Sequence, residues 1–165
     1  MTDTRQVLPG KVRGTISPPP SKSAAHRALL CAGLAGQGTV DGILPSMDMQ
    51  ATIGGLTALG LAVEMTGTRA AISQRPRVDA PVVDCIESGS TIRFLIPIFG
   101  ALGIPATFVG QGRLPHRPMD TYQQILPPHG VTITSSGPAA LPLSIGGRLR
   151  GGEYALPGDI SSPFI

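Results

Sequence analysis

The stretch MDMQATIGGLTALG, residues 47–60, and the stretch MDTYQQILPPHG, residues 119–130, follow one pattern. Each begins with a Met-Asp pair, continues as an amphipathic segment and stops at a glycine, after which comes a β-prone run. Asp48 and Asp120 are typical of helix N-caps, and the final glycines are typical of the position just past a helix end. The chain therefore contains an internal repeat, with its two aspartates 72 positions apart.

Small hydroxyl residues recur at a similar period in front of apolar runs. They lie within residues 21–23, 88–91 and 158–162, and Arg27 and Arg93 follow the first two groups about one helical turn later. We expect each group at a turn from a strand into a helix. Such a period of about 70 residues is typical of an array of supersecondary units.

The two patterns predict a mixed α/β fold (α+β), in which each unit runs strand, helix, strand, helix, strand, strand. The units fall at about residues 19–80, 81–150 and 151–165, and the last of them is incomplete. The sequence stops three residues after Ser162, a candidate N-cap, and so short a helix does not form alone because nucleation is costly. We therefore expect the sequence to be a fragment of a longer protein.

Composition argues against nucleic-acid and membrane partners. The formal net charge is +3 and the pI is near 9.3, but the basic residues are scattered and no tryptophan is present to stack on bases. Residues 94–112 carry no charge, yet prolines and glycines interrupt them, which predicts a buried helix and then a buried strand. Residues 1–11 lack the apolar run of a signal peptide, so we expect a cytoplasmic protein.

The segment SKSAAHR at residues 21–27 has chemistry that suits an anion. We expect a helix to begin near Ser23, and the free N–H groups and dipole of a helix start favour negative charge. Lys22 stands beside that start, and Ser23 and Arg27 are four residues apart, hence on one helix face. These donors suit a phosphate or a carboxylate. The alternative is an ordinary capped helix with surface Lys and Arg side chains.

Two further segments offer similar donors. In SGSTIR, residues 88–93, Gly89 permits a ligand to approach the backbone closely, and Arg93 either binds an anion or pairs with an acid such as Glu87. In GRLPHRPMD, residues 112–120, prolines hold Arg117 in place before a helix.

A third pair of hydroxyls, those of Ser161 and Ser162, stands at the start of the incomplete unit. Three such helix starts indicate a polyanionic small substrate, or two anionic substrates side by side. The histidines and cysteines have no metal-ligand spacing, so no metal site is predicted, and the histidines are interpreted as surface or structural residues: His26, His116 and His129.

Four segments together resemble the motifs of one family, the EPSP synthases (3-phosphoshikimate 1-carboxyvinyltransferases). PPSKSAAHRAL at residues 19–29 is similar to its N-terminal signature, and SGSTIRFL at 88–95 to its glycine loop. RPMD at 117–120 resembles its Arg-Pro-Met/Leu motif, and LPGDISS at 156–162 its third-repeat turn. The alternatives are an enzyme like the UDP-N-acetylglucosamine enolpyruvyltransferases, which usually begin with a Gly-Ala-Lys-Asn-type motif, and a non-catalytic anion- or RNA-binding repeat domain.

The resemblance implies the enolpyruvyl-transferase-like fold of six repeats, three in each of two domains, with the active site in the cleft between them. Residues 1–18 are then a strand of the second domain, and residues 19–165 a truncated substrate-binding domain. The implied reaction transfers the enolpyruvyl group of phosphoenolpyruvate to the 5-hydroxyl of shikimate 3-phosphate and releases phosphate. It implies a monomeric parent enzyme and no metal or organic cofactor, and the fragment alone should be inactive.

The resemblance also implies roles for individual residues. Lys22 touches both substrates, Ser23 and Arg27 hold shikimate 3-phosphate, and Gly89 and Arg117 bind phosphoenolpyruvate. The remaining implied residues are two contacts to the shikimate phosphate and two supporting residues: Ser161, Ser162, Ser90 and Arg93. No catalytic acid or base is implied in this part of the family's sequence.

Two positions depart from the family pattern. Pro163 stands where the family has a Gln that contacts both ligands, and a proline has no N–H to donate. Glu87 stands where many members have Asn or Asp.

Overall fold

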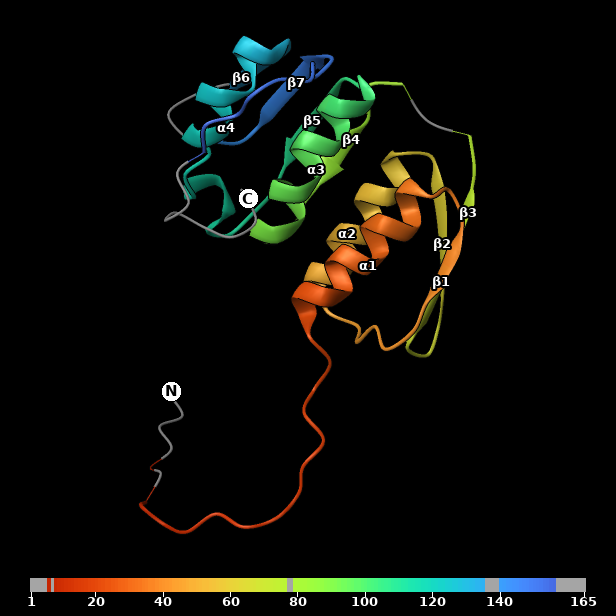
Figure 1. Cartoon of the computed structure of the whole chain (residues 1–165), viewed down its shortest axis with the longest axis vertical. Helices are drawn as coiled ribbons and strands as arrows, with labels where there is room; N and C mark the ends of the chain where they lie inside the picture. The colour runs from red at the N-terminus through yellow and green to blue at the C-terminus, as the bar shows by residue number, and fades with distance from the viewer. Residues whose placement is uncertain (1–5, 7, 77–78, 136–139, 157–165) are drawn as a thin grey trace.

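A computed structural model describes residue 6 and residues 8–76, 79–135 and 140–156 of the chain (Figure 1). Its first unit contains the elements α1 (Lys22–Leu34), β1 (Gly38–Val40), α2 (Met47–Ala58), β2 (Leu61–Thr66) and β3 (Arg69–Gln74). The strands form an antiparallel sheet in the order β1-β3-β2, with Val63 opposite Ile72. Helices α1 and α2 cover one face of this sheet (Figure 1).

The second unit repeats this arrangement with one more strand. Its elements are β4 (Val82–Asp84), α3 (Gly89–Leu102), β5 (Ala106–Val109), η1 (Leu114–His116), α4 (Asp120–Ile125), η2 (Pro127–His129), β6 (Val131–Ser135) and β7 (Leu143–Gly147). The sheet order is β4-β5-β7-β6, where β4 pairs parallel to β5 and the other pairs are antiparallel. The part β5-β7-β6 therefore corresponds to β1-β3-β2, and the second unit confirms the predicted order of elements.

The first unit starts at its helix. Residue 6 and residues 8–20 lie outside helices and strands and are exposed, and the segment extends away from the body of the molecule (Figure 1). The assignment of residues 1–18 to a second domain therefore stays a prediction, and so does the third unit, because residues 157–165 lie outside the described part.

Serine side chains cap the helices that carry the candidate site. Ser21 Oγ accepts the N–H of Ala24, so α1 begins one residue before the predicted Ser23. Ser46 Oγ accepts the N–H of Met49 at 3.2 Å, which makes Ser46 the N-cap of α2. The prediction that Asp48 is the N-cap is wrong, because the Ser46 hydroxyl already serves the free N–H group and Asp48 lies within the first turn.

Asp120 is likewise the first residue of α4 and not its N-cap, since Met119 precedes it without a side-chain cap. The glycine at the end of the first repeat copy behaves as predicted, because Gly60 follows the C-cap Leu59 with a φ of +88°. In the second copy Gly130 ends η2, since the prolines at 127 and 128 have no N–H to continue α4.

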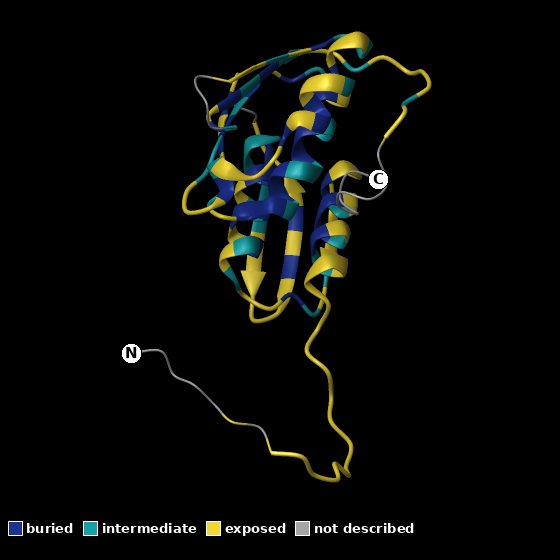
Figure 2. Cartoon of the chain, turned by 90° about the vertical axis from the view of Figure 1, so that its left-hand side faces the viewer, coloured by how far each residue is buried: buried dark blue, intermediate teal, exposed yellow. Residues whose placement is uncertain are grey.

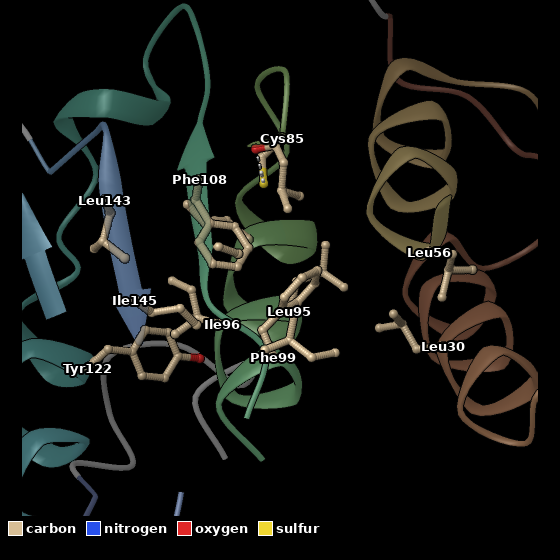
Figure 3. Packing of buried hydrophobic residues seen from close by; sticks show 14 of the residues in the cluster. Leu30, Leu56, Cys85, Leu95, Ile96, Phe99, Phe108, Tyr122, Leu143 and Ile145 are labelled. Carbon is tan, nitrogen blue, oxygen red and sulfur yellow. Dashed lines mark hydrogen bonds between the residues drawn. The ribbon is translucent and has the colours of Figure 1, made fainter. Parts of the chain in front are cut away.

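The core is continuous across both units. Phe99 of α3 and Phe108 of β5 pack edge to face, with ring centroids 5.5 Å apart (Figure 3). Gly55 of α2 lets Leu95 of α3 pack directly against the helix backbone, which joins the first unit to the second. Figure 2 shows the buried residues gathered where helices and sheets face one another.

The uncharged segment 94–112 forms the end of α3 and strand β5, both lined by buried residues, as the sequence predicts. Within the described residues, none of the helices has the length and apolar character needed to cross a membrane.

Candidate anion-binding site

Four of the predicted site residues line one small cavity at the start of α3. The cavity has a volume of about 370 Å³ and is open to solvent. Its lining comes from the first turn of α2, the turn into α3 and the loop before α4, and consists of Met47, Asp48, Glu87, Ser88, Gly89, Ser90, Arg93 and Arg117. The structure thus brings together Gly89, Ser90, Arg93 and Arg117.

Two guanidinium groups, those of Arg93 and Arg117, lie close to the Cα atom of Gly89. A Cβ atom at this position would lie 2.5 Å from Nη1 of Arg117 and 3.2 Å from Nη1 of Arg93. Glycine therefore allows both side chains to lie over the first turn of α3. Burial, and in second place the charge of Arg117, lowers the pKa of Arg93. Because a guanidinium stays charged at any physiological pH, two adjacent cations stand at a helix start and favour an anion between them.

Glu87 holds the loop that leads to Arg117. Its Oε1 atom accepts the backbone N–H of Arg113 at 3.0 Å, and its carboxylate lies against Gly112, whose φ is +60°. Any side chain at Gly112 would collide with that carboxylate. Glu87 therefore connects the turn into α3 with the loop before α4, and Arg113 is exposed.

Lys22 is not part of the cavity's lining but is bound to Asp48, which is. The Lys22 ammonium lies 2.7 Å from Oδ2 of Asp48, and the Lys22 side chain is 61% exposed. Asp48 itself lines the cavity, whereas Lys22 lines a separate hollow of about 360 Å³ between the starts of α1 and α2. Sequence reasoning missed this role of Asp48, although the repeated Met-Asp pair marked the position.

Ser23 and Arg27 lie further along α1. Nη1 of Arg27 donates to the backbone oxygen of Ser23 at 3.5 Å, which confirms that the two residues share a helix face. The Arg27 guanidinium lies 5.3 Å from the ring centroid of Phe94, a cation–π distance.

Arg27 and Arg93 are also neighbours in a larger, mainly apolar groove of about 630 Å³ that contacts α1, α3 and α4. Arg93 therefore lies between the cavity and this groove. The remaining predicted residues, Ser161 and Ser162, lie outside the described part of the chain.

The three histidines occupy different environments. His26 is 1% exposed, His116 is exposed, and the His129 ring stacks on Tyr154 with centroids 3.9 Å apart. Among the described residues, no group of three or more His, Cys, Asp or Glu side chains is arranged to hold a metal ion.

The architecture has clear counterparts among solved structures. An EPSP synthase from Acinetobacter baumannii superposes with a TM-score of 0.78 at 25% sequence identity, over 92% of this chain and 36% of that chain. A second structure of an Acinetobacter baumannii EPSP synthase gives a TM-score of 0.77 at 26% identity. Repeated α/β units with this topology place the chain among proteins of the enolpyruvyl transferase fold.

Sequence comparison narrows this class to one family. The model of the family EPSP synthase (3-phosphoshikimate 1-carboxyvinyltransferase) matches residues 8–165, and the chain belongs to that family. A 3-phosphoshikimate 1-carboxyvinyltransferase from Clostridium kluyveri is 40% identical over 163 residues, which are 96% of this chain and 38% of that protein. Its counterpart from Clostridium novyi is 38% identical over 172 residues. The chain thus spans less than two-fifths of the length of the curated relatives that it matches.

Proposed function

We propose that a protein with this sequence transfers the enolpyruvyl group of phosphoenolpyruvate to the 5-hydroxyl of shikimate 3-phosphate, releasing phosphate, and that this chain supplies one part of the substrate site. The observation that carries the proposal is the pair of guanidinium groups on Gly89, with the ammonium of Lys22 held nearby by Asp48. Both substrates are polyanions, and this arrangement places cations and helix-start N–H groups around one cavity.

The positions of the residues and the family membership support the following proposed roles. Arg117 and the backbone at Gly89 bind phosphoenolpyruvate, while Ser23 and Arg27 on α1 hold shikimate 3-phosphate. Lys22, between these two groups, contacts both substrates. The remaining residues support the cavity or bind the shikimate phosphate: Ser90, Arg93, Ser161 and Ser162.

The chemistry requires positioning and charge stabilisation more than a covalent enzyme intermediate. Protonation of the methylene carbon makes C2 of phosphoenolpyruvate electrophilic, and the 5-oxygen of shikimate 3-phosphate adds to C2 as its own proton leaves. The C2–O bond to phosphate then breaks, and loss of a methyl proton restores the double bond. The cations of this chain orient the two substrates and stabilise the departing phosphate, and the acid–base groups come from the rest of the protein.

The same proposal assigns residues 1–18 to a second domain and residues 19–165 to the substrate-binding domain. It is supported by the exposed, extended course of residues 8–18, which join neither sheet. We further infer a monomeric cytoplasmic enzyme that uses no metal or organic cofactor, which size-exclusion chromatography and activity in the presence of chelator would test.

The test is a comparison between a full-length protein that carries this sequence and the 165-residue chain. The full-length protein should release phosphate only when both substrates are present, and the chain alone should release none. UDP-N-acetylglucosamine should not replace shikimate 3-phosphate, and RNA should not compete for binding. Phosphate release with UDP-N-acetylglucosamine, or RNA binding that shikimate 3-phosphate displaces, would contradict the proposal.

A further inference from the structure

A chain of buried hydrogen bonds crosses the three helices around the site. Nδ1 of His26 on α1 lies 2.7 Å from Oγ1 of Thr52 on α2, which lies 2.7 Å from Oγ1 of Thr91 on α3. Thr91 donates in turn to Oγ of Ser88 at 2.7 Å. All four residues are at most 2% exposed, so water does not compete for these bonds.

We call this chain of hydrogen bonds from His26 to Ser88 the relay. The number of hydroxyl protons determines which group donates in each of its bonds. Each hydroxyl has a single proton, and that of Thr91 is donated to Ser88 Oγ or to the backbone oxygen of Asp48, its two acceptors. Thr52 must therefore donate to Thr91, which leaves the Nδ1–H group of His26 as the donor to Thr52. Nε2 of His26 is buried and has no hydrogen-bond partner among the described residues. It must be the unprotonated nitrogen, because a buried N–H without an acceptor costs more than a bare lone pair.

The charges around His26 agree with a neutral ring. Burial is the main cause that lowers its pKa; Asp48 on α2 opposes the shift, and Lys22 and Arg27 on α1 add to it. From α3, the neighbouring group is the uncharged ring of Phe94, with centroids 6.4 Å apart.

The relay ends where the anion cavity begins. Ser88 is the N-cap of α3: its Oγ atom accepts the N–H of Thr91, and it immediately precedes Gly89. The Thr91 hydroxyl also lies 3.3 Å from the backbone oxygen of Asp48, the residue that holds Lys22. The first turn of α3 is thus tied to the first turn of α2 at the point where both line the cavity.

We propose that His26 is a positioning residue for the anion site. Through Thr52 and Thr91 it sets the first turn of α3 against the first turn of α2, and so fixes the distance between the guanidinium pair and the ammonium of Lys22. This inference rests on the proposed function only in the choice of ligand; the relay itself is independent of it.

Isosteric substitutions test the relay without creating a cavity in the core. Thr52→Val removes the hydroxyl and keeps the shape, whereas Thr52→Ser keeps the hydroxyl. We expect Thr52→Val to weaken binding of phosphoenolpyruvate to the 165-residue chain about fivefold, the effect of one buried hydrogen bond, and Thr52→Ser to change it less than twofold. Thr107→Val is the control, because it breaks another side-chain hydrogen bond, a part-buried one to Ser144 in the second sheet. Equal affinities for Thr52→Val and the control would overturn the proposal.

Two NMR measurements test the relay in the absence of any ligand. The imidazole nitrogen shifts of His26 should show a protonated Nδ1 and an unprotonated Nε2 at neutral pH, and Thr52→Val should move the amide resonances of Ser88 and Gly89 while Thr107→Val does not. The opposite tautomer, a charged ring, or unmoved amides would refute the relay. If the unaltered chain binds no phosphoenolpyruvate, the proposed share of this chain in the substrate site fails, and these two measurements still test the relay.

Discussion

The guanidinium of Arg117 lies against the Cα atom of Gly89, with Nη1 only 2.5 Å from the point where any other residue would place its Cβ. The two residues are 28 positions apart in sequence, and they meet because the loop before α4 crosses the start of α3. A helix start and a cation from another segment therefore face the same cavity, which is the arrangement that an anion requires.

Gly89→Ala should weaken phosphoenolpyruvate binding about tenfold, because the methyl group displaces the flexible end of Arg117 from the helix start. The thermal midpoint should not fall, since alanine favours a helix more than glycine does. Isothermal titration calorimetry measures the affinity. Gly151→Ala is the control, as no atom lies within 4 Å of a Cβ there, and an affinity unchanged in both variants would contradict the assigned role of Gly89.

Lys22→Arg should not support turnover in a full-length protein that carries this sequence. An ammonium is a compact donor with three protons, while a guanidinium is a wider planar fork. In the proposed site Lys22, which pairs with Asp48, also contacts two anions. We expect a loss of at least about tenfold in kcat/KM, equivalent to about 1.4 kcal/mol in transition-state stabilisation. Lys11→Arg, on the exposed N-terminal segment, should leave kcat/KM unchanged. Near-normal turnover in both variants would mean that Lys22 is an ordinary surface charge.

Alanine substitutions at the two adjacent glycines of α2, Gly54 and Gly55, should change the free energy of unfolding in opposite directions. A Cβ at Gly55 would collide with Leu95 of α3, so Gly55→Ala should lower the free energy of unfolding by about 1–3 kcal/mol. Gly54 has open space around it, and Gly54→Ala should raise that free energy by about 0.5–1 kcal/mol. Urea denaturation of the two variants measures both changes. Equal effects would show that α2 and α3 do not pack as closely as described.

His26 should make stability depend on pH in mildly acidic solution. Burial lowers its pKa in the folded chain, so as the pH falls below about 6.5 the unfolded chain takes up the proton first. Stability should therefore decrease as the pH falls from about 6.5 through the folded pKa, and His26 should contribute no slope above this window. In His26→Asn this part of the profile should flatten, while His116 and His129 are present in both proteins. Identical slopes for the two proteins would contradict the buried neutral ring.

Local patterns in the sequence were sufficient to predict the repeat and four of the residues that line the cavity. The order of elements in the second unit, the glycine that follows α2 and the start of a helix beside Gly89 depend on nearby residues, and all are confirmed, while anion binding at that helix start stays a prediction. The prediction failed where two neighbouring groups compete for one role. Ser46 and Asp48 both cap helices well; α2 begins at Met47, so Ser46 takes the N-cap position and Asp48 in the first turn pairs with Lys22.

The long-range contacts could not be read from the sequence. Lys22 and Asp48 are 26 positions apart, as are His26 and Thr52, and both pairs exist because α1 packs beside α2. A histidine in an apolar helix looks the same in sequence whether it faces solvent or a buried threonine. Only the packing of the three helices distinguishes these cases.

The central claim is that the starts of α1 and α3 together bind the anionic substrates, and a titration of the isotope-labelled 165-residue chain with shikimate 3-phosphate tests it most directly. We predict saturable shifts in the amide resonances of Lys22, Ser23, Gly89 and Ser90, which weaken as salt is added and require about tenfold more ligand in Arg27→Ala. Arg69→Ala, which removes a distant exposed ion pair with Asp41, should titrate like the unaltered chain. Resonances that stay fixed at both helix starts in the folded chain, or that shift only at other surfaces, would contradict the account.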